Sequence, residues 1–293
     1  MTPALGLTVY HPDKADHGYT LFAPMTGTSA YLIDMQGRIV QHWALPYRPG
    51  AYGYLLDNGH LLVAGRTGKS PVPFGGAGGT LMELDWDGKV LWEHVEDTMH
   101  HDFCRLPNGN TMVLGWEPVP ADMVPHIKGG QPGTEHEGNI WCDCFREITP
   151  EHRVVWEWHG YEHLDVETDR ICPLDRRHEW AHANTCEVLP DGNVLTSFRL
   201  LNTVAIIDRH SGAFVWKWGR GDSGTSTTRI SSPTVTCSCL ITAGMPPTPR
   251  PAPVCSKCSP PRTPLSGATK PNRDGSFLAR SSAEHSACLT AIP

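Results

Sequence analysis

Two kinds of hydrophobic and polar segment alternate along the first 220 residues of the chain. Both carry a turn of acidic residues, asparagine or glycine between runs in which apolar and polar residues alternate with a period of two, which is the strongest local signal for a β-hairpin. The first kind has β-branched residues and Trp after its turn and covers residues 32–43, 83–95, 147–158 and 206–218. The second kind covers residues 55–66, 106–116 and 189–199.

One hairpin of each kind makes a four-stranded unit, or blade. Blades that repeat every roughly 50 to 80 residues predict a β-propeller rather than a sandwich, and no helical period competes with this pattern. We therefore expect an all-β fold in which residues 1–220 form a partial β-propeller of about four four-stranded blades. The Trp residues near the hairpin ends are expected to pack between blades.

The composition changes at residue 220. All ten Trp and fifteen of the sixteen His precede it, whereas residues 221–293 hold eleven of the 26 Pro and a single aromatic residue, Phe277. So few large apolar side chains do not offset the entropy lost when a backbone becomes ordered. We expect residues 221–293 to be a disordered tail rich in Pro, Ser and Thr.

The tail also reads as the product of a shifted reading frame. Read one base earlier, residues 224–243 can become GHQHDPHILPNGNVLVLDNG, which restores a hairpin of the second kind where the repeat requires one. In the same frame residues 255–270 can become VLEVLPATHTVVWRYE, a hairpin of the first kind, and residues 288–293 can become VPNGNT. Three recoveries in one frame indicate a frameshift near residue 220, caused by a mutation or by a sequencing error.

Charge and hydropathy exclude several classes of function. Up to residue 220 the chain has 17 basic and 28 acidic residues, a net charge of −11, which is the wrong sign for a nucleic-acid or anionic-membrane surface. No segment is long and apolar enough to span a bilayer, and the N-terminus has neither the basic nor the apolar region of a signal peptide. We expect a cytoplasmic protein without a nucleic-acid or membrane partner. The oligomeric state stays open.

The ten Cys do not predict a disulfide framework or a metal site. Half of them lie in the tail, and the others have no metal-ligand spacing: Cys104, Cys142, Cys144, Cys172 and Cys186. In the CDC sequence at 142–144 the side chains alternate across a strand, which favours packing over ligation. We expect neither a bound metal nor a cofactor.

Polar residues precede the hairpins of the second kind, where strands would enter a central channel. These segments read MHHDFCRLPNGN at 99–110 and AHANTCEVLPDGN at 181–193, and the re-read tail would add GHQHDPHILPNGN. A single His is usually structural. Repetition at equivalent places in successive blades favours a ligand site at the propeller axis.

The HHD and HANT sequences, together with the Arg that closes the strand after HANT, resemble motifs of the arylsulfotransferase family. The resemblance covers residues 20–220 and the re-read tail, and it implies a six-bladed propeller. Members of the family move a sulfuryl group from a phenolic sulfate ester to a phenol through a sulfohistidine, without a nucleotide sulfate donor. The matching positions, and hence the candidate catalytic residues, are His101, His182, Asn184 and Arg199, with His100 as a neighbour.

The residue types suit this chemistry. A neutral imidazole is nucleophilic near pH 7 and can divide one transfer into two steps. Sulfuryl transfer, like phosphoryl transfer, leaves charge on peripheral oxygens, so preorganised hydrogen-bond donors stabilise it. We expect Arg199 and Asn184 to contact those oxygens, and His182 and His101 to orient the ester or handle the phenol proton. The alternative for Arg199 is an ion pair with a carboxylate.

One departure from the family pattern is serious. The nucleophile of the family resembles a His of the HQHD-like motif, and in this chain Thr225 to Thr228 occupy that place. About four blades would also leave two unpaired sheet edges. We expect the encoded chain to be inactive and poorly folded, and a frame-restored chain to be competent.

Three other functions remain open. A non-catalytic propeller scaffold is one, because a fold does not fix a function. A zinc or copper site built from three inward imidazoles is another, although Asn and Arg are poor neighbours for a cation. The third is a propeller with a quinone cofactor, for which the sequence offers no stacking arrangement.

Overall fold

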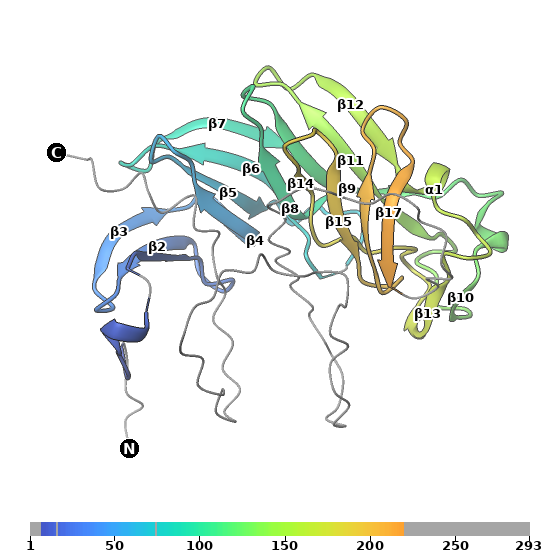
Figure 1. Cartoon of the computed structure of the whole chain (residues 1–293), viewed down its shortest axis with the longest axis horizontal. Coiled ribbons are helices and arrows are strands. Elements are labelled where there is room, and N and C mark those ends of the chain that lie inside the picture. Colours follow the sequence, from blue (N-terminus) through green and yellow to red (C-terminus); the bar gives the residue numbers. More distant parts are fainter. Residues whose placement is uncertain (1–6, 16, 74, 220–293) are drawn as a thin grey trace, which may run out of the picture. The chain divides into compact units, whose positions relative to one another are not determined.

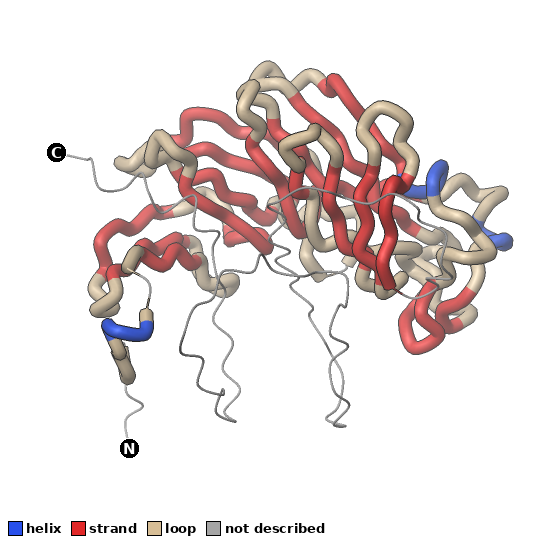
Figure 2. The backbone as a smooth tube through the Cα atoms, viewed as in Figure 1, coloured by secondary structure: helices blue, strands red, loops and turns tan. Residues whose placement is uncertain are grey.

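The computed structural model describes residues 7–15, 17–73 and 75–219, all within one compact unit, residues 1–228. Strands are the main secondary structure of this part of the chain and helices are few and short (Figure 2), so the predicted all-β class is confirmed. The predicted disordered tail at 221–293 and the re-read segments lie outside the described residues. No described helix is long and apolar enough to cross a membrane.

Three antiparallel sheets of four strands follow one another along the chain (Figure 1). The first contains β4 (Arg48–Leu55), β5 (Leu61–Arg66), β6 (Gly79–Leu84) and β7 (Val90–Val95). The second contains β8 (Met99–Arg105), β9 (Thr111–Pro118), β11 (Trp141–Ile148) and β12 (Val154–His159). The third contains β14 (Glu187–Val188), β15 (Val194–Phe198), β16 (Thr203–Ile207) and β17 (Phe214–Gly219). Each sheet is a meander of the two predicted hairpins.

The remaining elements are smaller. A three-stranded sheet precedes the others and contains β1 (Tyr19–Phe22), β2 (Ser29–Asp34) and β3 (Ile39–Ala44). The strands β10 (Gly129–Gln131) and β13 (Ile171–Arg176) pair in parallel, and they come from two long insertions that the hairpin pattern does not predict. The helices are α1 (Gly160–His163) and the 3₁₀ turns η1 (Pro12–Lys14) and η2 (Val124–His126).

The prediction of four-stranded blades is not met by the sheet of β1, β2 and β3, which has three strands among the described residues. The sequence explains the difference, because no hairpin of the second kind precedes the hairpin at 32–43. Among the described residues, β1 pairs only with β2 and β17 pairs only with β16, and no sheet closes on itself. Both ends of the series therefore carry a free strand edge in this part of the chain.

The turns of the second hairpin kind share one local geometry. Gly59, Gly109 and Gly192 have φ angles of 82°, 85° and 88°, which glycine adopts without steric penalty. In each turn the Asn or Asp before the glycine accepts a hydrogen bond from the backbone N–H two residues ahead, at 2.9–3.0 Å. The repeated Asn-Gly and Asp-Gly pairs therefore form the turns they predict.

Tryptophan indoles connect each sheet to the next. Trp43 Nε1 on β3 donates to Asp85 O at 3.0 Å, in the turn between β6 and β7. Trp92 on β7 donates in the same way to Pro150 O at 2.8 Å, and Trp158 on β12 donates to Gly212 O at 2.9 Å. The predicted packing of Trp between blades is confirmed at these positions. Trp218 on β17 is exposed.

The apolar core lies between successive sheets. One cluster joins Leu32 and Trp43, on β2 and β3, to Val63 and Met82, on β5 and β6. A further cluster joins the face of β5 and β6 to that of β8 and β9, and the largest extends from β9 and β11 to β15 and β16. Four-stranded sheets stacked face to face, each beginning with its inner strand, are the β-propeller arrangement that the repeat predicts.

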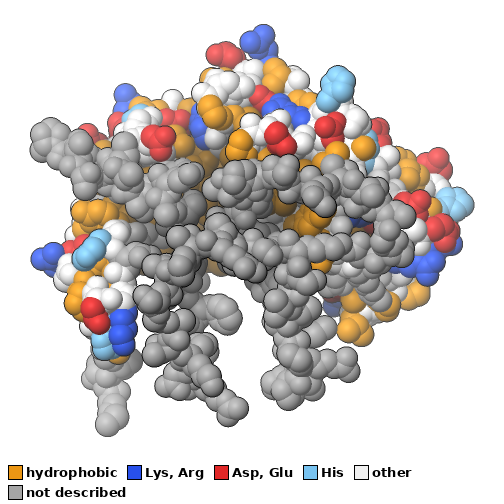
Figure 3. All heavy atoms as spheres, in the orientation of Figure 1, with side chains coloured by type: hydrophobic (Ala, Val, Ile, Leu, Met, Phe, Trp, Pro, Cys, Tyr) orange, Lys and Arg blue, Asp and Glu red, His pale blue; other side chains and the backbone are white. Residues whose placement is uncertain are grey.

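One face of the molecule shows how its charged side chains are distributed. On the face drawn in Figure 3, acidic and basic side chains are interspersed over the described residues. This agrees with the absence of a basic stripe from the sequence.

Candidate functional site

Two histidines from different sheets meet at the inner strands. The ring of His101, on β8, lies 4.8 Å from the ring of His182, in the segment before β14, with 69° between their planes. Both residues have positive φ angles, 50° and 58°, and the β8–β9 ladder is interrupted between Met99 and Phe103. Such backbone angles are uncommon outside glycine and often mark functional sites.

Gly76 supports the position of His101. Its carbonyl accepts the His101 N–H at 3.0 Å. A Cβ atom at Gly76 would lie 2.1 Å from the His101 ring, and the φ of Gly76 is 89°. Only glycine fits here, so the imidazole lies directly against the backbone.

His101 is uncharged at neutral pH. Burial, with the nearby charges of His100 and His182, lowers the pKa of His101 to about 3. Its Nδ1 lies 2.9 Å from Nδ1 of His100, so one of these two nitrogens carries the hydrogen. The Nδ1 atoms of His100 and His101 are thus hydrogen-bonded to each other. Nε2 of His101 has no hydrogen-bond partner among the described residues and can contact a ligand.

His100 is buried behind His101. Its ring stacks on Trp116 at 4.1 Å, and its Nε2 lies 3.3 Å from Asp143 Oδ1, within ion-pair distance but outside hydrogen-bond geometry. Asp143 Oδ1 also accepts the backbone N–H of Ala183 at 2.8 Å. A buried carboxylate thus connects the His100 segment to the His182 segment.

His182 has a buried carboxylate partner of its own. Its Nδ1 lies 2.5 Å from Glu179 Oε2, and the Glu179 side chain is 2% exposed. Burial alone would raise the pKa of Glu179, but hydrogen bonds from His178 and His182 hold it well below the usual range. Glu179 is therefore an anion beside the His182 ring.

Arg199 and Asn184 flank the histidines. The backbone N–H of Arg199 donates to His182 O at 3.0 Å, and that of Asn184 donates to Ser197 O at 2.9 Å. The Arg199 guanidinium lies 3.6 Å from Asp175 Oδ1, so the alternative of an ion pair is present. With 39% of its side chain exposed, Arg199 keeps N–H groups for an anionic ligand.

Sequence reasoning missed three acidic residues near this site. Glu179 and Asp143 are described above. The third is Asp102, whose Oδ2 accepts the Cys186 N–H at 2.9 Å, and burial raises its pKa to about 6. One signal was visible for each of the three residues. Asp102 ends the HHD sequence, Glu179 precedes His182 by three residues, and Asp143 is the only charge in the apolar start of its strand.

The cysteines have packing roles here. Cys142 and Cys144 are buried, as the alternating CDC pattern predicts, and burial raises the pKa of both thiols. Thiols of this kind are inert. In residues 7–15, 17–73 and 75–219, no group of three or more His, Cys, Asp or Glu is arranged to hold a metal ion.

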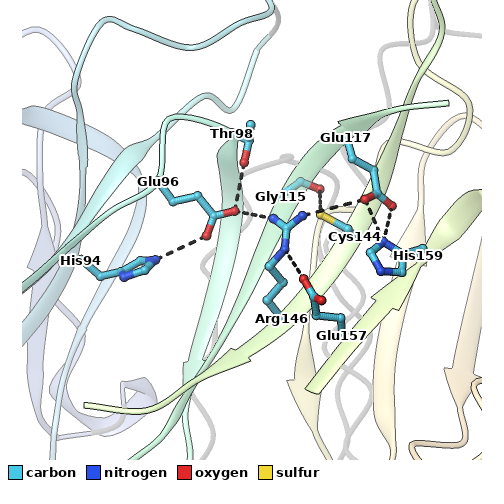
Figure 4. A network of polar contacts seen from close by, with 9 residues as sticks. All are labelled: His94, Glu96, Thr98, Gly115, Glu117, Cys144, Arg146, Glu157 and His159. Carbon is cyan, nitrogen blue, oxygen red and sulfur yellow. Dashed lines mark hydrogen bonds and ion pairs between the residues drawn. The ribbon is translucent and has the colours of Figure 1, made fainter. Parts of the chain in front are cut away.

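A separate polar cluster surrounds Arg146 on β11 (Figure 4). The guanidinium contacts Glu96 at 2.5 Å and Glu157 at 2.9 Å, and Glu117 lies at 3.8 Å. His159 Nδ1 is 2.8 Å from Glu117. One cation therefore compensates three carboxylates, of which Glu117 and Glu157 lie in the same sheet as Arg146 and Glu96 lies in the turn before that sheet, which is a structural role.

Comparison with known proteins gives a family match. The family model described as Arylsulfotransferase (ASST) matches residues 20–228. A search of curated proteins finds no match.

Solved structures show weak likenesses. A protein from Bacteroides caccae is 12% identical, with 71% of this chain and 74% of that chain covered and a TM-score of 0.35. The WD40 β-propeller domain of Doa1 is 10% identical, with 70% and 51% covered and a TM-score of 0.40. Virginiamycin B lyase from Staphylococcus aureus is 12% identical, with 70% and 53% covered and a TM-score of 0.38. The chain spans about half the length of the last two.

Proposed function

The chain belongs to the arylsulfotransferase family, and we propose that its site is built to transfer a sulfuryl group from a phenolic sulfate ester to a phenol. The observation that carries the proposal is the meeting of His101 and His182, from two sheets, beside Arg199 and Asn184. These are the four positions that match the family motifs.

The four residues have two roles, which follow from whether their side chains donate or accept hydrogen bonds. Arg199 and Asn184 donate to the sulfuryl oxygens, where charge develops during transfer. His182 and His101 are bases that hold or move the phenol proton. The uncharged state of His101 supports this role, because a protonated imidazole has no lone pair to offer.

The sulfur-accepting atom belongs to the re-read HQHD sequence. There an imidazole nitrogen forms an N–S bond as the O–S bond of the donor ester breaks and the first phenolate leaves. A second phenol then forms a new O–S bond, the N–S bond breaks, and the phenol proton passes to a neighbouring base. Thr225 to Thr228 stand in that place in this chain and offer no imidazole. We propose that the encoded chain is inactive and that a frame-restored chain is active.

Release of 4-nitrophenolate from 4-nitrophenyl sulfate, in the presence of phenol, tests this proposal. The encoded chain should give no transfer and the frame-restored chain should give ping-pong kinetics. A matched control restores the frame but keeps Thr225 and Thr227, which separates loss of the nucleophile from loss of the fold. Transfer by the encoded chain or by this control would overturn the role of the nucleophile, and a folded but inactive restored chain would overturn the function.

The alternative for the encoded chain is a non-catalytic propeller scaffold. The Thr residues at 225–228 favour it, because they replace the nucleophile, whereas the sequence of the described sheets keeps its hairpin pattern. This alternative requires that replacing His101, His182 or Arg199 leave all measured behaviour unchanged.

A further inference from the structure

We propose that Glu179 is a positioning residue, which holds His182 in the tautomer with hydrogen on Nδ1 so that Nε2 accepts the proton of the acceptor phenol. The assignment of the phenol rests on the proposed function. The tautomer does not, because it follows from the contact between His182 and Glu179 alone.

The first step is the state of the carboxylate. Glu179 lies 2.5 Å from His182 Nδ1 and is almost fully buried, and its other oxygen, Oε1, has no hydrogen-bond partner among the described residues. A buried anion is stable only where donors compensate it. The donors here are on His182 and on His178, whose Nε2 lies 3.6 Å away. The hydrogen of this contact must therefore be on Nδ1 of His182, since an ionised carboxylate only accepts.

The second step is the direction of the free nitrogen. The two nitrogens of an imidazole lie on different edges of the ring, so a neutral His182 with hydrogen on Nδ1 has its lone pair on Nε2. The backbone of His182 is held by the hydrogen bond from the Arg199 N–H to its carbonyl, and the contact of Nδ1 with Glu179 orients the ring itself. The ring lies 4.8 Å from that of His101, so Nε2 belongs to the same group of residues.

The third step is the division of roles. Arg199 and Asn184 carry donors for sulfuryl oxygens, which have no proton to give. An acceptor phenol brings one O–H group and needs one acceptor. Nε2 of His182 supplies it, and Glu179 prevents the other tautomer, which would present an N–H and repel the phenol hydrogen.

Histidine nitrogen NMR on the encoded chain tests the tautomer directly. With ¹⁵N-labelled His, and His182 assigned by its loss in His182→Gln, Nδ1 should resonate as a protonated nitrogen and Nε2 as an unprotonated one. In Glu179→Gln the two signals should move toward a mixture, because a Gln amide both donates and accepts. Glu117→Gln is the matched control: it removes a carboxylate 2.8 Å from Nδ1 of His159 and should leave the His182 signals unchanged.

Titration of the same samples with phenol tests the ligand. In the encoded chain the Nε2 signal of His182 should shift, and Glu179→Gln should weaken phenol binding by about tenfold, as expected for the loss of one hydrogen bond to an oriented acceptor. His182 signals unaltered by Glu179→Gln, or hydrogen on Nε2 in the unchanged chain, would overturn the role of Glu179. The expected tautomer without any response to phenol, in the encoded and in the frame-restored chain alike, would leave that role standing and contradict the proposed function.

Discussion

The imidazoles of His101 and His182 lie 4.8 Å apart, although one belongs to the inner strand of one sheet and the other leads into the inner strand of the next. Neighbouring sheets of a propeller bring their inner strands together at one axis, so equivalent segments meet there. The polar residues that precede successive hairpins in the sequence therefore also lie close together in the structure.

Replacement of His101 should slow sulfuryl transfer in a frame-restored chain. Replacing it by Gln removes a base and should lower kcat/KM for sulfuryl transfer by roughly 10²- to 10⁴-fold, the range for general acid–base groups. His60→Gln is a suitable control, because His60 lies 2.8 Å from Glu83 in a similar pair outside the site. Equal rates for both variants would favour the scaffold alternative.

Gly76 should be irreplaceable for a steric reason. In Gly76→Ala the new Cβ would overlap the His101 ring, so the ring must move away from residue 76. Gly59→Ala has a similar φ, 82°, but nothing lies within 4 Å of its Cβ, so it should cost only backbone strain of about 1–2 kcal/mol. Crystal structures and urea unfolding of the two variants measure the difference. An unmoved His101 ring in Gly76→Ala would contradict the expectation.

Asp102 should give stability an inverse dependence on pH. Its folded pKa of about 6 exceeds the ordinary value of 3.8, so between these pH values the folded chain holds a proton that the unfolded chain has lost. The free energy of unfolding should therefore fall as pH rises through this window, by at most about 1.4 kcal/mol per unit.

Asp102→Asn keeps an acceptor for the Cys186 N–H and should remove this slope. Urea unfolding between pH 4 and 7 measures it, with Asp87→Asn, an exposed acid, as the control. A slope that persists in Asp102→Asn would assign the effect to another group.

Within the polar cluster around Arg146, replacement of Arg146 should lower the free energy of unfolding more than replacement of any of its carboxylate partners. Arg146→Met leaves Glu96 and Glu117 buried without their cation, and removal of one partner from such a pair costs about 3–5 kcal/mol. Glu157→Gln, on a side chain that is 42% exposed, should cost less than about 1 kcal/mol. Urea unfolding of both variants gives the comparison, and similar losses would show that Arg146 has no special weight.

The hairpins and the Trp contacts could be predicted because both follow from the repeated pattern of the sequence. The hairpins follow from short turns such as that at Gly109, whose backbone angle and hydrogen bonds depend only on neighbouring residues. The contacts of Trp43 and Trp158 were predictable because both residues stand at the same point of a hairpin of the first kind. His101 and His182 stood out for the same reason.

The contacts that were missed depend on segments without a repeat signal, which fold back on themselves or onto another sheet. Glu179 contacts His182 only because the segment between them turns back, and Asp143 becomes part of the site only when the Ala183 segment folds over it. The ion pair between Arg199 and Asp175 joins the end of one strand to an insertion that has no repeat signal. No periodicity encodes such contacts.

The indole hydrogen bonds run in one direction, from the last strand of each sheet to a turn of its successor. Stability in such a series is a sum of units and the junctions between neighbours. Loss of downstream units therefore removes one junction and leaves the earlier ones whole. In a chain of this design, a change in the later part of the sequence shortens the series of sheets, and the hydrogen bonds between the earlier sheets are kept.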